Sequence, residues 1–465
     1  MTTRLSRAVL TLGAVLAAAG LTVPAAAADS LGGDSTSPAP ALSIGGAVIT
    51  DGRFTAKADP QVSYQEYRLN LTADARPADQ ASFHTEAWLL TSGISSNITT
   101  SSDLFNLQNV IPLTVDLREA YFELRGFLLE SMDLKVGRQR IAWGTADKLN
   151  PTDNVNPYDL RDPWDFGRHL GSDGAQLSVY VGGLQLTGLV VTVFRPAVLP
   201  QGAWATALAP AASAVPSGVT VGTSTVSVSL PGASFLDGVT TGLKLKGNLL
   251  GWDLSGSYLY ARQSLPAYRI NVTMTSPATA NVATDLVYPR EHVFGADLAG
   301  SIFGIGVWGE AAVFLPEKVT QLTDLTALGM GIQTSTVLDS APYVKFTVGA
   351  DYTFPGDVYL NLQYLHGLFN EAGVSALQDY FALGFEWRLL DGKLILSPLS
   401  GMVEIKDWSD LAGSSAIIAS PSFTVRPMDN AELVIGLHWV EGGSRSTYGV
   451  LKDANEVFAQ ARYQF

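Results

Sequence analysis

Polar and apolar residues alternate along most of this chain. In residues 62–74, the even-numbered positions from 66 onward are polar and the odd-numbered ones are apolar, and residues 343–352 and 432–439 show the same alternation. Successive side chains of a β-strand point to opposite faces of the sheet. Each such segment therefore predicts a strand with one dry face and one wet face.

The connections between these segments come in two lengths that alternate along the chain. Short ones, such as residues 182–183 and 248–251, are rich in the Gly, Asn and Asp that tight turns require. Longer ones include residues 142–174 and 195–237. A β-sandwich also has alternating strands, but a transmembrane barrel explains in addition why short turns and long loops alternate. The fold class predicted is therefore all-β, a transmembrane antiparallel up-and-down β-barrel.

The pattern predicts nine hairpins, hence about eighteen strands, with both termini on the periplasmic side. A barrel of sixteen strands remains an alternative, because residues 41–50 and 414–425 alternate only weakly. A barrel of either size is wide enough to enclose an aqueous channel. The predicted strands are 41–50, 62–75, 80–91, 115–125, 131–141, 175–182, 184–194, 238–247, 250–262, 292–301, 303–315, 343–353, 356–367, 378–389, 393–404, 414–425, 430–442 and 456–465.

Aromatic residues gather near the ends of the predicted strands, as expected at the two surfaces of a membrane. The chain also ends in an alternating segment that closes on Phe465. This ending resembles the C-terminal strand by which outer-membrane barrels are recognised, so the barrel-assembly machinery, outer-membrane lipid and lipopolysaccharide are the expected partners. The aromatic residues in question are Tyr64, Tyr67, Tyr258, Tyr260, Phe354, Tyr359, Tyr364, Phe385 and Trp387.

Composition agrees with this fold class. Only 15% of the residues are charged, against about 25% in a typical soluble domain. Beyond the N-terminus no apolar run reaches the roughly 18 residues of a membrane helix. The chain has no cysteine and a net charge of −14, which argues against thiol chemistry and against nucleic acid as a partner.

The N-terminus predicts export. Arg4 and Arg7 precede an apolar core, and small residues before Asp29 form a cleavage site, which is the layout of a secretory signal peptide. The predicted organisation is a signal peptide at 1–28, a polar lead at 29–40 and the barrel at 41–465, located in the cell outer membrane.

The polar residues at alternate strand positions are expected to line a pore, because a water-filled lumen accepts charges that lipid excludes. For any one of these residues, merely solvating the wall remains the simpler interpretation. Lys244 and Lys246, two alternate positions of one strand, are the best candidates for a local basic patch. The predicted lumen or constriction residues are Glu66, Arg68, Glu86, Glu119, Glu123, Lys135, Lys244, Lys246, Lys345, Glu432 and Arg462.

The most distinctive stretch runs from the sequence REAY at 118–121, through GRQRIAWG at 137–144, to the Asn-Pro pairs that follow. It resembles a poorly characterised family of Gram-negative outer-membrane barrels marked by REAY, GRQxxxWG and NPxD motifs. It is more distantly similar to alginate-export and other substrate-selective porins. The resemblance covers about 45 residues and implies an outer-membrane channel without a settled substrate. The motif residues are Gly137, Arg138, Gln139, Trp143, Gly144, Asp147, Asn150, Pro151 and Asp159.

The loop that follows this motif, residues 142–174, is too long to be structureless in a stable barrel. We hypothesise that it folds inward and narrows the pore. Gly137 and Gly144 permit a close approach or a bulge, and Trp143 is expected at the level of the membrane interface. Arg138 and Arg140 share the parity of the dry face. Either Gly137 shifts the register there, or the two arginines reach headgroup phosphates.

The aspartates of this loop raise the question of a metal. A calcium ion favours several oxygen ligands, but the spacing matches no calcium loop and Asx turns are the simpler interpretation. No metal site and no cofactor are therefore expected. The aspartates are Asp147, Asp153, Asp159, Asp162 and Asp165.

A second long loop has no charged residue between Pro196 and Leu236. A disordered tether is one interpretation of its low complexity, but residues 219–230 alternate enough to predict an extended hairpin. An uncharged surface loop suits an apolar or neutral substrate, although no involvement in substrate binding remains the simpler alternative.

The leading functional hypothesis is an outer-membrane, porin-like channel for passive diffusion of small solutes, with substrate selectivity and homo-oligomer formation left open. A non-conducting barrel that serves as an adhesin or scaffold is the alternative. An outer-membrane barrel hydrolase would need a nucleophile beside its base. None of the five histidines lies in a hydrolase signature, so no catalytic residue is predicted and the chain is not expected to be an enzyme.

Overall fold

The computed structural model describes residues 41–92, 98–147, 149–208, 218–232 and 234–465. The predicted signal peptide and polar lead lie outside these residues. None of the described helices has both the length and the apolar character needed to cross a membrane.

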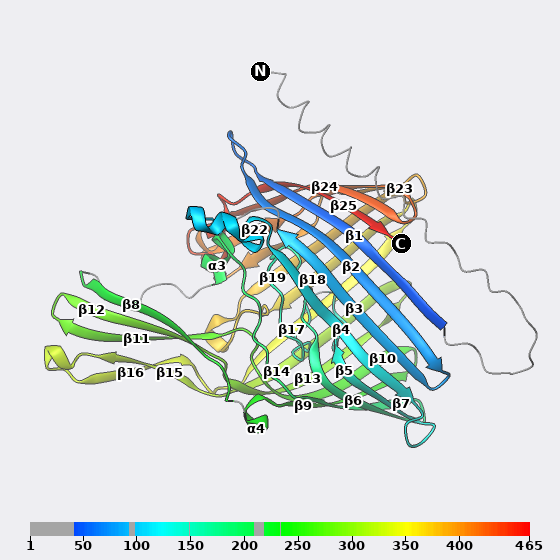
Figure 1. The fold of residues 1–465 in the computed structure, drawn as a ribbon, viewed down its shortest axis with the longest axis horizontal. Coiled ribbons are helices and arrows are strands. Elements are labelled where there is room, and N and C mark those ends of the chain that lie inside the picture. The colour runs from blue at the N-terminus through cyan, green and yellow to red at the C-terminus, as the bar shows by residue number, and fades with distance from the viewer. Residues whose placement is uncertain (1–40, 93–97, 148, 209–217, 233) are drawn as a thin grey trace, which may run out of the picture. The chain divides into compact units, whose positions relative to one another are not determined.

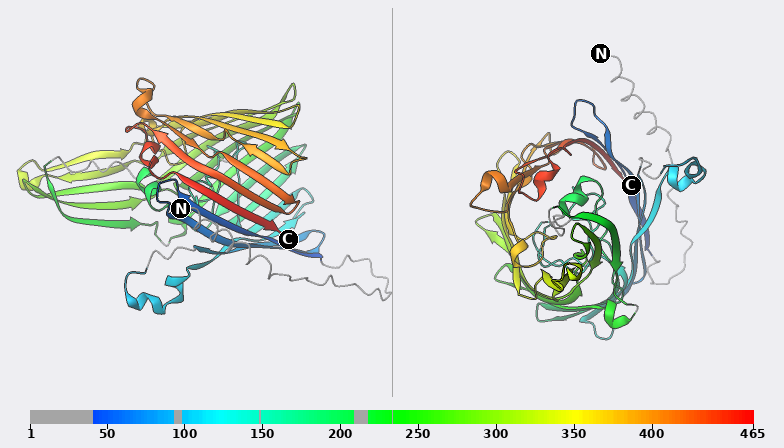
Figure 2. Two further views of the ribbon diagram at one scale, coloured as in Figure 1. Left: turned by 90° about the horizontal axis from the view of Figure 1, so that it is seen from above. Right: turned by 90° about the vertical axis from the view of Figure 1, so that its left-hand side faces the viewer.

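Eighteen antiparallel strands, each paired with its neighbours in chain order, close into an up-and-down barrel (Figures 1 and 2). The predicted fold class is confirmed, including the two weakly patterned strands. Two strands are interrupted, where Pro398 and Pro421 remove a backbone donor. The staves in order are β1 (Ala41–Thr55), β2 (Val62–Ala78), β3 (Ala81–Ser92), β4 (Leu113–Arg125), β5 (Met132–Gln139), β6 (Ser172–Val181), β7 (Leu184–Val191), β9 (Thr240–Leu249), β10 (Trp252–Arg262), β13 (Arg290–Ile302), β14 (Ile305–Pro316), β17 (Tyr343–Phe354), β18 (Val358–His366), β19 (Asp379–Leu389), β20 with β21 (Leu394–Ser397, Gly401–Ile405), β22 with β23 (Ser415–Ala419, Ser422–Met428), β24 (Ala431–Gly442) and β25 (Glu456–Gln464).

The barrel closes where its last strand meets its first. β25 pairs with β1 in antiparallel register from Thr55 to Ala47. Beyond that ladder, the Gly46 amide donates to the Phe465 carbonyl at 3.0 Å, and the Phe465 amide donates back to Gly46 at 3.1 Å. In the described part of the chain, every barrel strand is therefore paired on both of its sides, as a β-structure in lipid requires.

The register separates an apolar outer face from a mixed inner face. Outward residues such as Leu243 and Leu245 on β9 are 52% and 48% exposed, whereas the inward Gly242 and Lys244 face the barrel interior. Inward positions also include two aromatic residues expected at the membrane surface. Tyr64 donates its hydroxyl to Glu66, and Tyr359 donates to Asp351. For these two residues the predicted interfacial position is wrong, because their parity turns them inward.

Three of the long connections contribute to a second, five-stranded sheet that the sequence analysis did not predict (Figure 1). Residues 219–230 were expected to form a hairpin, but they form one strand that pairs in parallel with β12. The segment is therefore an edge strand of this sheet, and it pairs with a strand from another long connection. This sheet has the order β16 (Ile332–Leu338), β15 (Val319–Asp324), β11 (Ala267–Ser276), β12 (Thr279–Val287) and β8 (Thr220–Ser229).

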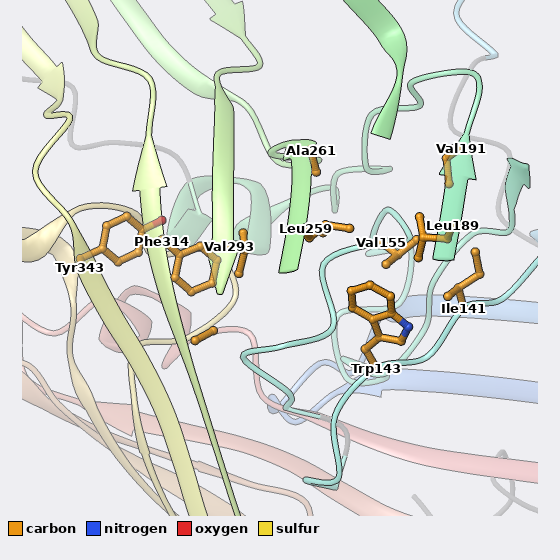
Figure 3. Close-up of a cluster of buried hydrophobic side chains, with 11 residues drawn as sticks. Ile141, Trp143, Val155, Leu189, Val191, Leu259, Ala261, Val293, Phe314 and Tyr343 are labelled. Carbon is orange, nitrogen blue, oxygen red and sulfur yellow. The ribbon is translucent and has the colours of Figure 1, made fainter. Parts of the chain in front are cut away.

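Apolar side chains pack inside the barrel in two separate clusters. The first cluster joins the chain that follows β5 to the barrel wall. Ile141, Trp143 and Val155 pack there against inward residues of β7, β10, β13, β14 and β17 (Figure 3). Trp143 is only 4% exposed, so its predicted place at the membrane interface is wrong. The second cluster packs Trp204 of α3 and Tyr448 of η4 against β18–β24. The short helices are η1 (Ser101–Phe105), α2 (Leu107–Val110), α3 (Ala203–Leu208), α4 (Phe235–Gly238), η2 (Thr326–Leu328), η3 (Val374–Ala376), α5 (Leu411–Ser414) and η4 (Tyr448–Leu451).

Candidate functional site

Between β5 and β6, residues 140–147 and 149–171 lie inside the barrel and form a segment that we call the inward loop. One of its attachments is Glu310, an inward residue of β14. The Glu310 carboxylate accepts backbone N–H groups of Thr145 at 2.7 Å, Ala146 at 3.1 Å and Thr152 at 3.4 Å. Gly144 has a φ of +99°, and a Cβ there would lie 2.5 Å from a Glu310 oxygen. The glycine therefore permits this close approach.

The inward loop is also attached to β1 and β2, half-way around the ring of strands from β14. Arg53 of β1 donates to both carboxylate oxygens of Asp162, at 2.9 and 2.6 Å, and to Asp51 at 2.7 Å. Arg168 approaches Glu66 of β2 at 3.5 Å. All five side chains are buried. The loop is therefore held on two sides of the wall and crosses the interior between them.

A β-bulge supplies a third attachment. Glu86 and Ala87 of β3 face Glu119 and Leu117 of β4, so Arg118 is the extra residue. Arg118 points inward, donates to Asp159 at 2.9 Å and also donates to the His169 carbonyl. The bulge thus turns a motif arginine onto the inward loop.

Asp159 is fully buried and carries a charge. Burial alone would raise the pKa of its carboxyl group, but hydrogen bonds from Arg161 and the charges of Arg161, Arg168 and Arg118 lower that pKa to about 2. Asp159 is therefore ionised at neutral pH and joins two arginines, Arg118 and Arg161, in one ion-paired group.

Trp88 of β3 lies among the arginines that attach the inward loop to β2 and β4. The guanidinium groups of Arg118, Arg68 and Arg168 lie over its ring at 4.0, 4.3 and 5.5 Å from the centroid. Glu66 lies between two of these cations, 3.3 Å from Arg68 and 3.5 Å from Arg168. An indole face and shared carboxylates allow several buried arginines to lie close together.

The two motif arginines beyond Gly137 separate to opposite sides of the wall. Gly137 has a φ of +131°, and a Cβ there would collide with the Ala120 carbonyl. Arg138 lies on the outward parity and pairs with Asp173 at 2.7 Å. β5 ends at Gln139, and Arg140 turns inward to bind Asp153 and Asn156. For Arg140 neither alternative holds: the β4–β5 register does not shift at Gly137, and the side chain binds the inward loop because the strand has already ended.

Most of the remaining motif residues serve the loop itself. Gln139 is 1% exposed and accepts from Gln176 at 2.7 Å. Asn150 donates to the Ala146 carbonyl at 2.6 Å, and Pro151 is buried. Asp147 is exposed. Of the loop aspartates considered for calcium, four pair with arginines: Asp153, Asp159, Asp162 and Asp165.

The other predicted lumen residues are not gathered at the inward loop. Glu123 lies 3.9 Å from Lys135, Lys244 lies 3.5 Å from Asp297, and Glu432 accepts from Arg426 at 2.9 Å. These pairs match the simpler interpretation, in which charges solvate the wall and compensate each other. Lys246 and Arg462 are exposed, and Lys345 is buried against another loop, residues 367–378.

Among the described residues, one group has the spacing of metal ligands. His84, Glu86 and Glu119 each offer an atom within 4.8 Å of the others. The His84 Nδ1 atom is 2.7 Å from Asp74, Glu86 accepts from Trp88, and Glu119 accepts the Arg140 amide. These bonds place the three side chains without any ion.

Several residues of the site were missed in the sequence analysis. Asp51 and Arg53 were assigned to a loop because residues 41–50 alternate only weakly, whereas β1 extends through both residues to Thr55. The arginines at 161 and 168 carry no periodic signal because they lie in an irregular segment. Polar residues at the alternate positions 51 and 53 were a weak local signal for the first pair, whereas nothing local marked the second.

No family model and no curated protein matches the chain. Three similar solved structures are OmpF of Salmonella typhi in complex with daunomycin (8% identity, TM-score 0.41, covering 91% of this chain and 97% of that one), a loop L8 deletion mutant of OmpT, an outer membrane protein of Vibrio cholerae (10%, 0.39, 92% and 100%), and OccK9 of Pseudomonas aeruginosa (12%, 0.49, 92% and 97%). With identities and scores this low, the function has to be argued from the chain's own residues.

Proposed function

We propose that this chain is an outer-membrane, porin-like channel through which small solutes diffuse passively, and that the inward loop forms its constriction. The observation that carries the proposal is the attachment of that loop to both sides of the wall, through Glu310 on one side and Arg53 and Glu66 on the other. A loop held across a wide barrel by buried ion pairs narrows the passage without closing the strands on themselves.

The outer face supports the membrane location. Apolar side chains at alternate strand positions remain exposed around the barrel, Leu243, Val344 and Ile435 among them. A protein surrounded by water would bury such a band or bind something over it. Lipid is the environment that this face and the closed hydrogen-bond ladder suit together.

A non-conducting barrel that acts as an adhesin or scaffold is the second candidate. The observation that favours it is the pair of apolar clusters inside the barrel, which occupy part of the interior. A hydrolase has less support, because the two inward histidines are not placed beside a nucleophile. His438 stacks between Trp164 and Phe458 at ring distances of 4.1 and 4.3 Å, and His84 is hydrogen-bonded to Asp74.

Planar-bilayer recording tests the proposal. Purified, refolded protein is expected to produce stepwise conductance increments that persist when all five histidines are replaced. Protein denatured by heat before addition provides the control. A bilayer that stays silent, although the added protein is folded and inserted, would support the scaffold and reject the channel.

Neutralising Lys246 is expected to shift ion selectivity away from anions. Lys246 is exposed on the inward parity of β9, whereas Lys244 on the same strand lies 3.5 Å from Asp297. Because a nearby carboxylate compensates Lys244, Lys246→Gln should move the reversal potential in a KCl gradient more than Lys244→Gln does. Equal reversal potentials for wild type and the double variant would reject a basic patch.

A further inference from the structure

An apolar groove of about 450 Å³ lies on the outer face of the barrel, across β5, β6, β7, β9 and β10. The strand register places one outward residue of each strand in a single row, formed by Leu134, Leu177, Gly188, Leu243 and Tyr258. Gly188 has no side chain, and a Cβ added there would meet Leu243 alone among the described residues, at 3.6 Å. The glycine therefore leaves a hollow between larger apolar residues.

The groove continues into a second outward row, nearer to the long connections. Ala175 lies in this row, level with Val136 on one side and Val190 on the other. Ala175, Val190 and Thr241 line the groove together with the first row. Two residues of a strand span about 7 Å, so the small residues Ala175 and Gly188 open an apolar strip that follows the strand direction. Such a strip fits a hydrocarbon chain.

A third outward row, at the end of the strip, is charged. Arg138, two residues beyond Val136, is level with Asp173 and pairs with it at 2.7 Å. Arg195, which follows the end of β7, also pairs with Asp173. The side chains of Arg138, Arg195 and Asp173 are 27%, 30% and 31% exposed. Within the described part of the chain neither arginine has another acidic ion-pair partner, so two cations share one anion.

The position of this row indicates which chemical group balances the excess positive charge. A charge on the lipid-facing side of a barrel is costly in the middle of the bilayer and tolerated near the headgroups. The row lies where β5 ends and β6 begins, on the side of the long connections. These connections face the cell exterior in the orientation expected of such a barrel. Arginine binds phosphate through paired hydrogen bonds, and basic groups at a membrane surface attract phosphorylated headgroups.

We propose that this surface binds lipid A, the phosphorylated and acylated disaccharide that anchors lipopolysaccharide in the outer leaflet. A phosphate of lipid A accepts hydrogen bonds from Arg138 and Arg195, and one acyl chain follows the strip past Ala175 to Gly188. The first and third rows are four residues apart, about 13 Å along the strands, which a fatty-acyl chain can span. The proposal rests on the outer-membrane location proposed above and is independent of conduction.

Native mass spectrometry of the refolded chain, released from a non-ionic detergent, tests the charged row. The probes are diphosphoryl lipid A, the same lipid without its phosphates, and phosphatidylglycerol. Diphosphoryl lipid A is expected to bind more tightly than the other two. Arg195→Gln should weaken this binding about tenfold or more, because a hydrogen bond between charged groups is lost. Asp173→Asn should tighten it several-fold, because the carboxylate that competes with the phosphate is removed.

The groove is tested by filling it. Gly188→Leu is expected to weaken lipid A binding, because the new side chain occupies the hollow. Gly309→Leu on β14 is the matched control: a Cβ there meets the outward Val348, also at 3.6 Å, and Gly309 does not line the groove. Arg76→Gln, at an exposed position beside a short turn at the other end of the barrel, controls for the loss of an arginine. Both controls should bind lipid A as wild type does.

Several results would overturn the proposal. They are no binding of lipid A by the folded wild type, equal or tighter binding of either other probe, weaker binding by Asp173→Asn, and unchanged binding by folded Arg195→Gln or Gly188→Leu. A dimer mass that is present in wild type and lost in Gly188→Leu would assign the groove to a second copy of the chain instead. Channels that conduct but bind no lipid A would reject this site alone, whereas lipid A binding by a barrel that never conducts would reject the channel alone.

Discussion

Replacing residues 146–168 with a short glycine–serine linker is expected to raise single-channel conductance several-fold. The deleted segment carries Asp162 and Arg168, which attach the inward loop to Arg53 and Glu66. It also carries Thr152, one of the amides bound to Glu310. Without these contacts only Thr145 and His169, at the two ends of the deletion, remain bound to the wall. The linker between them is free to leave the lumen, and a barrel of eighteen strands is wide enough to conduct freely.

A matched deletion distinguishes the constriction from a general loosening. Residues 321–335 belong to the hairpin of β15 and β16, which pairs in the separate five-stranded sheet. Removing them should leave the conductance unchanged. If both deletions gave the wild-type increment, the inward loop would not be the narrowest part of the pore, and the constriction hypothesis would be wrong.

Asp162→Ala is expected to destabilise the protein by about 3–5 kcal/mol, the usual cost of removing one partner of a buried ion pair. Arg53 would keep Asp51, but it would lose the two bonds to Asp162 while remaining buried at 3% exposure. Urea unfolding in lipid vesicles, followed by tryptophan fluorescence, measures the loss. Trp164 lies two residues from Asp162 and stacks on His438, so its environment should change when the loop detaches.

A triple variant separates charge from packing. Because Arg53 also pairs with buried Asp51, Arg53→Met combined with Asp51→Leu and Asp162→Leu removes all three charges and keeps apolar volume, so it should cost less than Asp162→Ala alone. Asp147→Ala supplies the control, because that loop aspartate is exposed and should change the free energy of unfolding by no more than about 0.5 kcal/mol. An Asp162→Ala protein as stable as the control would show that the Arg53–Asp162 pair does not hold the loop.

The barrel strands were predictable from the sequence because the signal for most of them is local, although residues 41–50 and 414–425 alternate only weakly. A residue in a barrel strand faces either lipid or the interior, so apolar residues recur at every second position of the wall. Inward positions are usually polar, except where loops pack against the wall, as at Leu259 and Phe314. The turns were equally local: at 182–183 both residues are glycines with positive φ, as a two-residue hairpin turn requires. Even the weakly patterned residues 41–50 form a strand, which extends to Thr55.

The candidate site was predictable only in part. Glu66, Arg68 and Glu119 were placed on the inner wall by parity, and the register puts them there. Arg118 had the wrong parity for an inward residue and reaches the interior only through the bulge. Trp143 and Arg140 follow the end of β5, where alternation no longer indicates direction. A bulge and a strand end each interrupt the period of two, so parity fails at these points.

The sequence by itself thus determined the barrel fold and the polar character of its inner face, and it left the strand number open between sixteen and eighteen. Only the tertiary structure decided what fills the interior. Arg53 meets Asp162 across 109 positions of chain, and Glu310 meets Thr145 across 165. The pairing of β8 with β12 likewise joins two different loops. Alternation records which environment each residue faces, whereas these contacts depend on which distant residues share that environment, and closing the barrel is what brings them together.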